Sequence, residues 1–198
     1  MKTIQIKESI EKSVLSQITN KNILVLGGAG FIGSWLSEFL LQSDASVTCI
    51  DNFSSGREKN IKTCLKHPRF ELIRSDICEI DSLDKHYDII YHLASRASPF
   101  EFEDFPLEIL DSNTIGTRRA LELARLNNSR FVFASTSEIY GNPSVIPTPE
   151  NYLGYVSSTG QRSCYDEGKR CGEAYVMAYK KQFGLDVRIA RIFNTYGP

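Results

Sequence analysis

The stretch Ile23-Leu24-Val25-Leu26-Gly27-Gly28-Ala29-Gly30-Phe31-Ile32-Gly33 joins an apolar run to glycines spaced three residues apart. The apolar run predicts a buried strand, and the residues after Gly30 predict the first turn of an amphipathic helix. Gly27 permits a tight turn, Gly30 lets the backbone approach a pyrophosphate, and Gly33 lets the helix pack close to the strand. The helix N-terminus favours the negative charge of that pyrophosphate.

Asp51 indicates that the ligand of this turn is a dinucleotide. It ends the next apolar run, 18 residues beyond Gly33, where a carboxylate can accept a hydrogen bond from a ribose hydroxyl. A carboxylate there also repels a 2′-phosphate, which favours NAD over NADP as the cofactor. Arg57 lies close enough in sequence to leave NADP open.

Short apolar runs alternate with segments of helical periodicity along the rest of the chain. Strands are expected at 23–26, 46–50, 70–73, 89–93, 131–134 and 187–192. Helices are expected at 31–42, 57–66, 105–127 and 164–183, with a shorter piece near 79–85. This alternation implies right-handed crossovers. The predicted fold class is α/β, with a doubly wound parallel sheet of the Rossmann type.

The chain is expected to divide into a leader, residues 1–20, and an NAD-binding Rossmann domain, residues 21–198. The apolar residues of the leader have the spacing of a short amphipathic helix: Ile10, Val14, Leu15 and Ile18. This helix would pack on the domain or be partly ordered, or it would serve self-association. The sequence ends directly after the sixth expected strand, as if cut before a further domain.

Composition narrows the classes of partner. The net charge is −1, which gives no reason to expect nucleic acid or an anionic membrane as a partner. No apolar run approaches the ~20 residues that span a bilayer. The five cysteines are scattered without a Cys-x-x-Cys pair, so we expect neither a disulfide framework nor a metal site. A reducing, cytoplasmic setting fits this cysteine usage.

Two further strand ends are candidates for cofactor contacts. Asp76 follows the third expected strand, where it would reach an adenine amino group or cap a short helix. Leu93-Ala94-Ser95 follows the fourth, and small residues there let the backbone pass close to a cofactor. The residues expected to contact the cofactor are Gly27, Gly30, Phe31, Ile32, Gly33, Asp51, Asn52, Asp76, Ile77, Leu93, Ala94, Ser95, Tyr165 and Lys169.

Tyr165 and Lys169 are four residues apart, on one face of an expected helix. A phenol with a pKa of about 10 is a poor base at neutral pH. A nearby ammonium lowers that pKa, so the pair could remove a hydroxyl proton during hydride transfer. Tyr and Lys four residues apart are common by chance on helices. The dinucleotide turn earlier in the chain is what makes a catalytic role for this pair credible.

Ser135-Thr136-Ser137-Glu138 follows the fifth expected strand. Residues at the carboxyl ends of parallel strands face the ligand crevice. Thr136 could therefore bond a sugar hydroxyl, while Ser137 and Glu138 could handle protons. The alternative is a turn cap of the Ser/Thr-x-Glu sort.

Together these residues resemble the extended short-chain dehydrogenase/reductase family of NAD-dependent epimerases and dehydratases. Within it they are most similar to the UDP-glucuronate decarboxylases (UDP-xylose synthases). The resemblance runs from about Lys21 to Pro198. Its most specific strings are Ser-Thr-Ser-Glu-Ile-Tyr-Gly at 135–141 and Arg-Ser-Cys-Tyr-Asp-Glu-Gly-Lys-Arg at 162–170. The other matching stretches are 27–34, 51–53, 92–95, 113–117 and 188–198.

The resemblance implies an NAD-dependent lyase that turns UDP-glucuronate into UDP-xylose. Tyr165, supported by Lys169, takes the proton of the C4 hydroxyl while NAD⁺ accepts hydride. The resulting 4-keto sugar loses its carboxylate as CO₂ and is then reduced. Thr136 would bind the C4 oxygen, and Ser137 and Glu138 would assist the proton steps. Asn194 and Arg162 are the candidates for substrate binding.

The dTDP-glucose 4,6-dehydratases and the nucleotide-sugar 4-epimerases are the alternatives within this family. The dehydratases typically carry Asp where this chain has Ser137, and the epimerases usually lack the following Glu. A third possibility, of another class, is an NAD-binding module without turnover, which is the behaviour we expect of this chain alone. The resemblance also implies a homodimer.

Two loops depart from the decarboxylase pattern. Arg96 stands where proline is usual, and residues 157–161 replace the usual Asn-Pro-Ile-Gly-Pro. These loops border the sugar, so the substrate could differ. The family's C-terminal domain normally supplies an arginine for the substrate carboxylate, and no residue of this sequence is expected to replace it.

Overall fold

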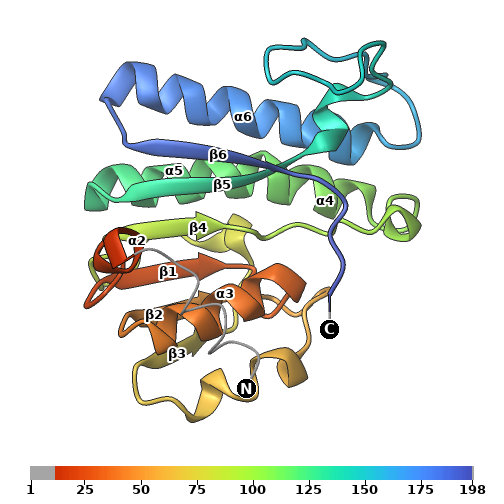
Figure 1. Ribbon diagram of the computed structural model, residues 1–198. Coiled ribbons are helices and arrows are strands. Elements are labelled where there is room, and N and C mark those ends of the chain that lie inside the picture. The colour runs from red at the N-terminus through yellow and green to blue at the C-terminus, as the bar shows by residue number, and fades with distance from the viewer. Residues whose placement is uncertain (1–11, 198) are drawn as a thin grey trace.

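A single parallel sheet forms the centre of the computed structural model, which describes residues 12–197 (Figure 1). Its six strands run in the order β3-β2-β1-β4-β5-β6. In chain order they are β1 (Asn22–Leu26), β2 (Ser46–Ile50), β3 (Phe70–Ile73), β4 (Ile89–His92), β5 (Arg130–Thr136) and β6 (Val187–Ile192). The first three strands are added outward from β1 in one direction and the last three outward from β4 in the other. This reversal between β1 and β4 confirms the doubly wound Rossmann sheet.

The side chains of β1 alternate between two buried layers. Leu24 and Leu26 pack with Leu121 and Val176 on one face, and Ile23 packs with the layer on the other. The helices that cover the first face are α5 (Ile115–Asn127) and α6 (Ser163–Phe183), and α3 (Phe31–Gln42) covers the second. The helix α4 (Pro106–Asn113) packs against α6 and α5. Because both faces are covered, the central strands β1 and β4 are largely apolar and buried, as parallel strands usually are. The edge strands β3 and β6 carry charged residues as well, Glu71 on β3 and Arg188 and Arg191 on β6.

The helix expected at 105–127 is two helices. The chain bends at Thr114, whose φ of −111° and ψ of −72° depart from ideal helical values. The Thr114 hydroxyl donates a hydrogen bond of 2.7 Å to the carbonyl of Leu110, one turn earlier. A side-chain bond of this kind often bends a helix.

The helices expected at 57–66 and near 79–85 are absent. The first region holds two short 3-10 turns, η1 (Glu58–Ile61) and η2 (Cys64–Lys66). Ile61 and Cys64 are its buried apolar side chains, too few for an amphipathic α-helix to pack. In the second region the turn η3 (Ile77–Glu79) ends before residue 80.

The N-terminal leader is described from residue 12 onward. It contains the short helix α2 (Lys12–Ser16). Ile18 is buried in the same cluster as Ile23, with Leu15 against it, whereas Val14 is exposed. The described part of the leader therefore packs on the domain, and Ile10 lies outside the described residues.

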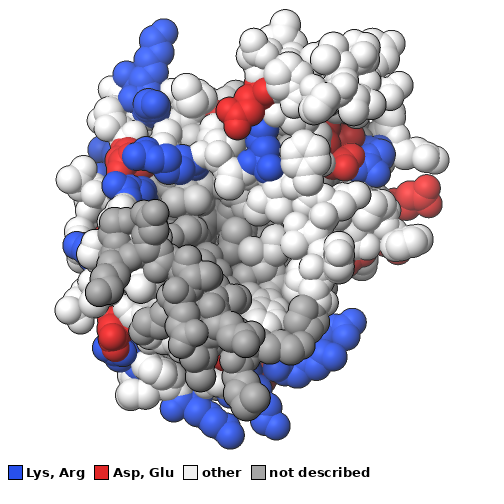
Figure 2. Space-filling view, viewed as in Figure 1, with Lys and Arg blue, Asp and Glu red and all other residues white. Residues whose placement is uncertain are grey.

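The surface carries charges of both signs. In the view of Figure 2, Lys and Arg lie in several separate groups with Asp and Glu beside some of them. Within residues 12–197, no helix is long and apolar enough to cross a membrane. No group of three His, Cys, Asp or Glu side chains in that range is arranged to hold a metal ion.

Candidate active site

Two adjoining cavities lie at the carboxyl ends of the strands. The Asp51 cavity, of about 300 Å³, is lined by residues at the ends of β1, β2, β3 and β4 and by Glu108, Asp111 and Ser112 of α4. The Tyr165 cavity, of about 550 Å³, is lined by the start of α3, the end of β5 and the start of α6. They share the lining residues Gly27, Gly30, Ser55, Leu93 and Ser95. The glycine turn therefore lies between them.

Close backbone packing requires glycine at two positions of this turn. Gly27 has φ +81°, and a Cβ on it would stand 2.6 Å from the backbone nitrogen of Ala94. A Cβ on Gly33 would stand 2.2 Å from the carbonyl oxygen of Gly27. Neither neighbour can move without shifting the sheet, so strand, turn and helix hold one another in place.

Gly30 has a different environment. It is the N-cap of α3 with φ −72°, and a Cβ on it would meet only the Gly27 carbonyl, at 3.3 Å. Gly30 lines both cavities, so a side chain here would occupy cavity space. This is the geometry that a phosphate needs to approach the first turn of α3.

Asp51 is buried and fixed by two backbone donors. One carboxylate oxygen accepts the N–H of Ala29 and the other accepts the N–H of Phe53, each at 2.8 Å. The carboxylate therefore joins the end of β2 to the glycine turn and lines the Asp51 cavity as well. Arg57 lies apart: it lines a separate hollow with Trp35 and Lys59.

Asp76 caps the N-terminus of the turn η3, which is one of the two roles predicted for it. Its Oδ1 accepts the N–H of Cys78 at 2.8 Å, and its Oδ2 accepts from the Asn52 amide at 2.7 Å. Asp76 also lines the Asp51 cavity. The other predicted cofactor contacts that line this cavity are Gly27, Gly30, Asp51, Asn52, Ile77, Leu93, Ala94 and Ser95.

Tyr165 is 7% exposed and stacks on Phe102, with ring centroids 5.1 Å apart. Burial raises the pKa of Tyr165 above its ordinary value, and hydrogen bonding with the Thr136 side chain opposes this only in part. Burial outweighs the favourable contacts, so the net shift of the Tyr165 pKa is upward and not downward as the spacing of Tyr165 and Lys169 predicted.

Lys169 lies one helical turn beyond Tyr165 and is 2% exposed. Its Nζ donates to the carbonyl of Ala134 at 2.8 Å and lies 5.8 Å from the Tyr165 ring centroid. Burial lowers the pKa of Lys169 to about 7. The amine is thus held at the end of β5, and near neutral pH its charged and neutral forms are similarly populated.

Of the residues at the end of β5, some line the Tyr165 cavity and one also caps the turn that follows. Thr136 Oγ1 accepts the N–H of Glu138 at 3.2 Å and so caps the turn η5 (Ser137–Tyr140). Thr136 and Glu138 both line the Tyr165 cavity, but Ser137 lines neither cavity. The structure therefore does not bring Ser137 into either cavity with Thr136 and Glu138, and its proton-handling role stays a prediction.

Arg162 joins two carboxylates at the entrance to α6. It forms an ion pair with Glu138, and its Nε lies 3.6 Å from Asp166 Oδ2. Burial raises the pKa of Asp166 to about 6, and the Arg162 charge opposes that rise. The remaining predicted residues that line the Tyr165 cavity are Phe31, Ile32, Gly33 and Asn194.

Several lining residues were missed from the sequence. Ser54 and Gly56 line the Asp51 cavity, Phe193 and Thr195 line the Tyr165 cavity, and Ser55 lines both. All of them directly follow β2 or β6, so the strand-end rule that singled out Asp51 could have found them.

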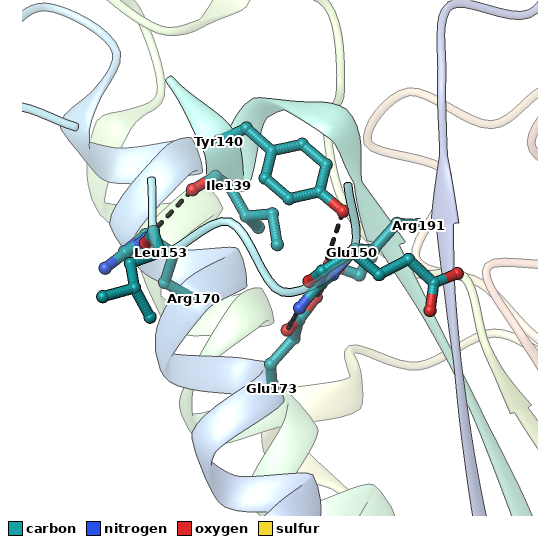
Figure 3. A network of polar contacts seen from close by, with 8 residues as sticks. Ile139, Tyr140, Glu150, Leu153, Arg170, Glu173 and Arg191 are labelled. Atoms are coloured by element: carbon teal, nitrogen blue, oxygen red, sulfur yellow. Dashed lines mark hydrogen bonds and ion pairs between the residues drawn. The ribbon is translucent and has the colours of Figure 1, made fainter. Parts of the chain in front are cut away.

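A polar network supports the wall of the Tyr165 cavity (Figure 3). Arg191 on β6 makes two bonds to Glu173 on α6, at 2.9 and 2.8 Å. Glu173 also accepts from Ser135 Oγ at 2.6 Å, and Arg191 donates to Tyr140 Oη at 2.8 Å. Arg170 on α6 donates to the carbonyls of 139 and 153, each at 2.9 Å. The loop between η5 and α6 is thereby fastened to both elements.

Comparison with known proteins places this geometry in a family context. The model described as the NAD dependent epimerase/dehydratase family matches residues 23–198. UDP-glucuronic acid decarboxylase 1 of Xenopus tropicalis is 48% identical over 184 residues, which is 93% of this chain and 43% of the relative. UDP-glucuronic acid decarboxylase 3 of Arabidopsis thaliana is 48% identical, over 90% of this chain and 52% of the relative. The chain thus spans about half the length of these curated relatives.

Solved structures give the same picture. Epimerase Mth375 of Methanothermobacter thermautotrophicus is 31% identical with a TM-score of 0.84, over 94% of this chain and 55% of that one. The Bordetella bronchiseptica enzyme WbmF in complex with NAD⁺ is 29% identical with a TM-score of 0.75, over 92% of this chain and 52% of that one. Both similarities cover more than nine-tenths of this chain and about half of the other.

Proposed function

This chain belongs to the NAD dependent epimerase/dehydratase family, and from that premise we propose that it holds NAD and oxidises the C4 position of a nucleotide sugar. The nucleotide sugar we propose is UDP-glucuronate, and the product of the whole reaction is UDP-xylose and CO₂. The observation that carries this is the joining of the two cavities at the glycine turn, with Tyr165, Lys169 and Thr136 in the second.

The residues of the Asp51 cavity fit an NAD molecule. The Gly30 position would be filled by a Cβ, so it leaves space for a diphosphate at the start of α3. Asp51 and Asp76 offer carboxylate oxygens to ribose and adenine at the other end. The placing of Arg57 in a separate hollow favours NAD over NADP.

When bound, NAD supplies a hydride acceptor beside the substrate. Tyr165 would remove the proton of the C4 hydroxyl, and Thr136 would hold the C4 oxygen by a hydrogen bond. Lys169, fixed to the Ala134 carbonyl, would stabilise the phenolate. A 4-keto group then accepts the electron pair released when the bond to the carboxylate breaks, so CO₂ can leave. C5 takes up a proton, and return of the hydride to C4, with the proton held by Tyr165, would give UDP-xylose.

Glu138 and Arg162 would serve the proton and substrate steps. In the structure they are paired with each other at the edge of the Tyr165 cavity. Substrate entry would place a new anion beside Arg162, which would free the Glu138 carboxylate for a proton at the sugar. Asn194, exposed at the cavity mouth, would contact the substrate diphosphate.

Decarboxylation is favoured over the related reactions by the identity of the relatives. The test is product analysis by mass spectrometry after incubation of the full-length protein with NAD⁺ and UDP-glucuronate, UDP-glucose or dTDP-glucose in separate reactions. We expect UDP-xylose and CO₂ from UDP-glucuronate alone. A 4-epimer of UDP-glucose or a 4-keto-6-deoxy product of dTDP-glucose would replace this proposal with the corresponding one. NAD binding with no product from any of the three would mark a binding module without turnover.

A further inference from the structure

The Asp51 cavity has an unusual balance of charge for a site that would take a diphosphate. Its lining carries five carboxylates: Asp51, Asp76, Glu79, Glu108 and Asp111. Arg96 also lines the cavity, and no other Lys or Arg of the described chain does so. An anion that enters this cavity therefore meets one cationic side chain among several acids.

Arg96 is held rigidly at the cavity wall. Its Nη1 is paired with Glu101, and its guanidinium lies 4.0 Å above the ring of Phe105. The side chain is 12% exposed. The planar guanidinium is thus already oriented before any ligand arrives, which lowers the entropy lost when it binds one.

Arg96 lies next to the point where the two cavities adjoin. It directly follows Ser95, which lines both of them. The backbone of Ala94, two residues before Arg96, lies directly against the Gly27 turn. A dinucleotide whose two ends occupy the two cavities would pass Gly30 and Ser95, which line both, so its diphosphate would lie beside the segment that carries Arg96.

We propose that Arg96 is a cofactor-binding residue that pairs with the diphosphate of NAD opposite the first turn of α3. This inference rests on the proposed NAD site. The pair with Glu101 engages Nη1, which leaves Nη2 for a phosphate oxygen. A guanidinium suits this task because it bonds phosphate directionally and stays charged at every accessible pH.

Calorimetric titration of Arg96→Ala with NAD, ADP-ribose and adenosine tests the proposal. NAD and ADP-ribose carry the diphosphate, whereas adenosine does not and is measured by competition. We expect the Kd of NAD and of ADP-ribose to rise about 10- to 100-fold, as for the loss of a charged hydrogen bond. The Kd of adenosine should stay within about twofold. Raising the salt concentration should weaken NAD binding to the wild type more than to the variant.

Arg74→Ala is a matched control. Arg74 is paired with Glu58 and its guanidinium lies 4.3 Å above the ring of Phe53, yet it lines neither cavity. It should bind NAD as the wild type does. Glu101→Gln should also retain NAD binding, because it frees Arg96 without removing its charge.

The outcomes separate a phosphate contact from a structural role. Equal losses for NAD and adenosine, or wild-type affinity for NAD in Arg96→Ala, would overturn the inference. If Arg96→Ala does not fold, Arg96→Lys decides instead: it keeps the charge and should bind NAD within about tenfold of wild type, and a complete loss would argue for a packing role. A wild type that binds no NAD would refute the proposed function itself, a result distinct from these.

Discussion

Lys169 on α6 donates a hydrogen bond of 2.8 Å to the carbonyl of Ala134 at the end of β5. This bond joins the helix that carries Tyr165 to the strand that carries Thr136, although the two bonded residues are 35 positions apart in the chain. The amine is therefore directed by the sheet and not by helix geometry alone. Its position fixes the side of the cavity on which proton removal would occur.

Tyr165→Phe is expected to abolish sugar oxidation while leaving the cofactor in place. The ring would keep its stacking on Phe102, and only the hydroxyl would be lost. General-base catalysis contributes about 10²- to 10⁴-fold, so the rate of UDP-xylose formation from UDP-glucuronate should fall by at least about 100-fold. The Kd of NAD should change by less than about threefold. Tyr175→Phe, on the same helix but outside both cavities, should leave the rate unchanged.

Gly30→Ala and Gly33→Ala should fail in different ways. At Gly30 an alanine fits the backbone but fills cavity space, so the variant should fold with a near-wild-type Tm and bind NAD at least about tenfold more weakly. At Gly33 the new Cβ would stand 2.2 Å from a backbone oxygen, so that variant should lose several kcal/mol of stability or not fold. Thermal melts and NAD titrations separate the two. Equal Tm values would contradict this reading.

The strands were predictable from sequence because each contains a short run rich in apolar residues, and three of them match to the residue: β2, β3 and β6. The two 3-10 turns in region 57–66 were not predictable. Apolar residues at helical spacing suggest a helix, but the spacing does not show whether the fold offers an apolar surface for that helix to pack on. The same limit applies to the site. The spacing of Tyr165 and Lys169 predicted their proximity, but neither the burial that raises the Tyr165 pKa nor the Ala134 acceptor can be read from spacing.

Asp166→Asn is expected to stabilise the protein at pH 7. Burial raises the pKa of Asp166 from 3.8 to about 6. Between those values the folded state binds more protons than the unfolded state, so stability falls as pH rises through this window and stays reduced above it. The variant lacks this penalty and should gain about 1–3 kcal/mol at pH 7 and little at pH 4, by urea unfolding. A loss at pH 7 that exceeds any loss at pH 4 would contradict the assignment.

Arg191→Lys should loosen the loop between η5 and α6. Lysine cannot keep both bonds to Glu173 together with the contact to Tyr140. We expect a loss of about 1–3 kcal/mol and faster hydrogen exchange at the amides of Asn142 and Tyr155, which bond across the loop. Arg188→Lys, whose ion pair is exposed, should cost less than about 1 kcal/mol and leave exchange there unchanged. Equal effects of the two variants would show that the network does not fasten the loop.

Calorimetric titration of the protein with NAD, alongside NADP, tests the central claim most directly. Asp51 lines the proposed adenosine end of the site and Arg57 lies in a separate hollow, so a 2′-phosphate would meet a carboxylate without a compensating cation. We predict saturable binding of one NAD per chain, with NADP at least about tenfold weaker. The absence of saturable NAD binding, or NADP binding as tight as NAD, would contradict the account.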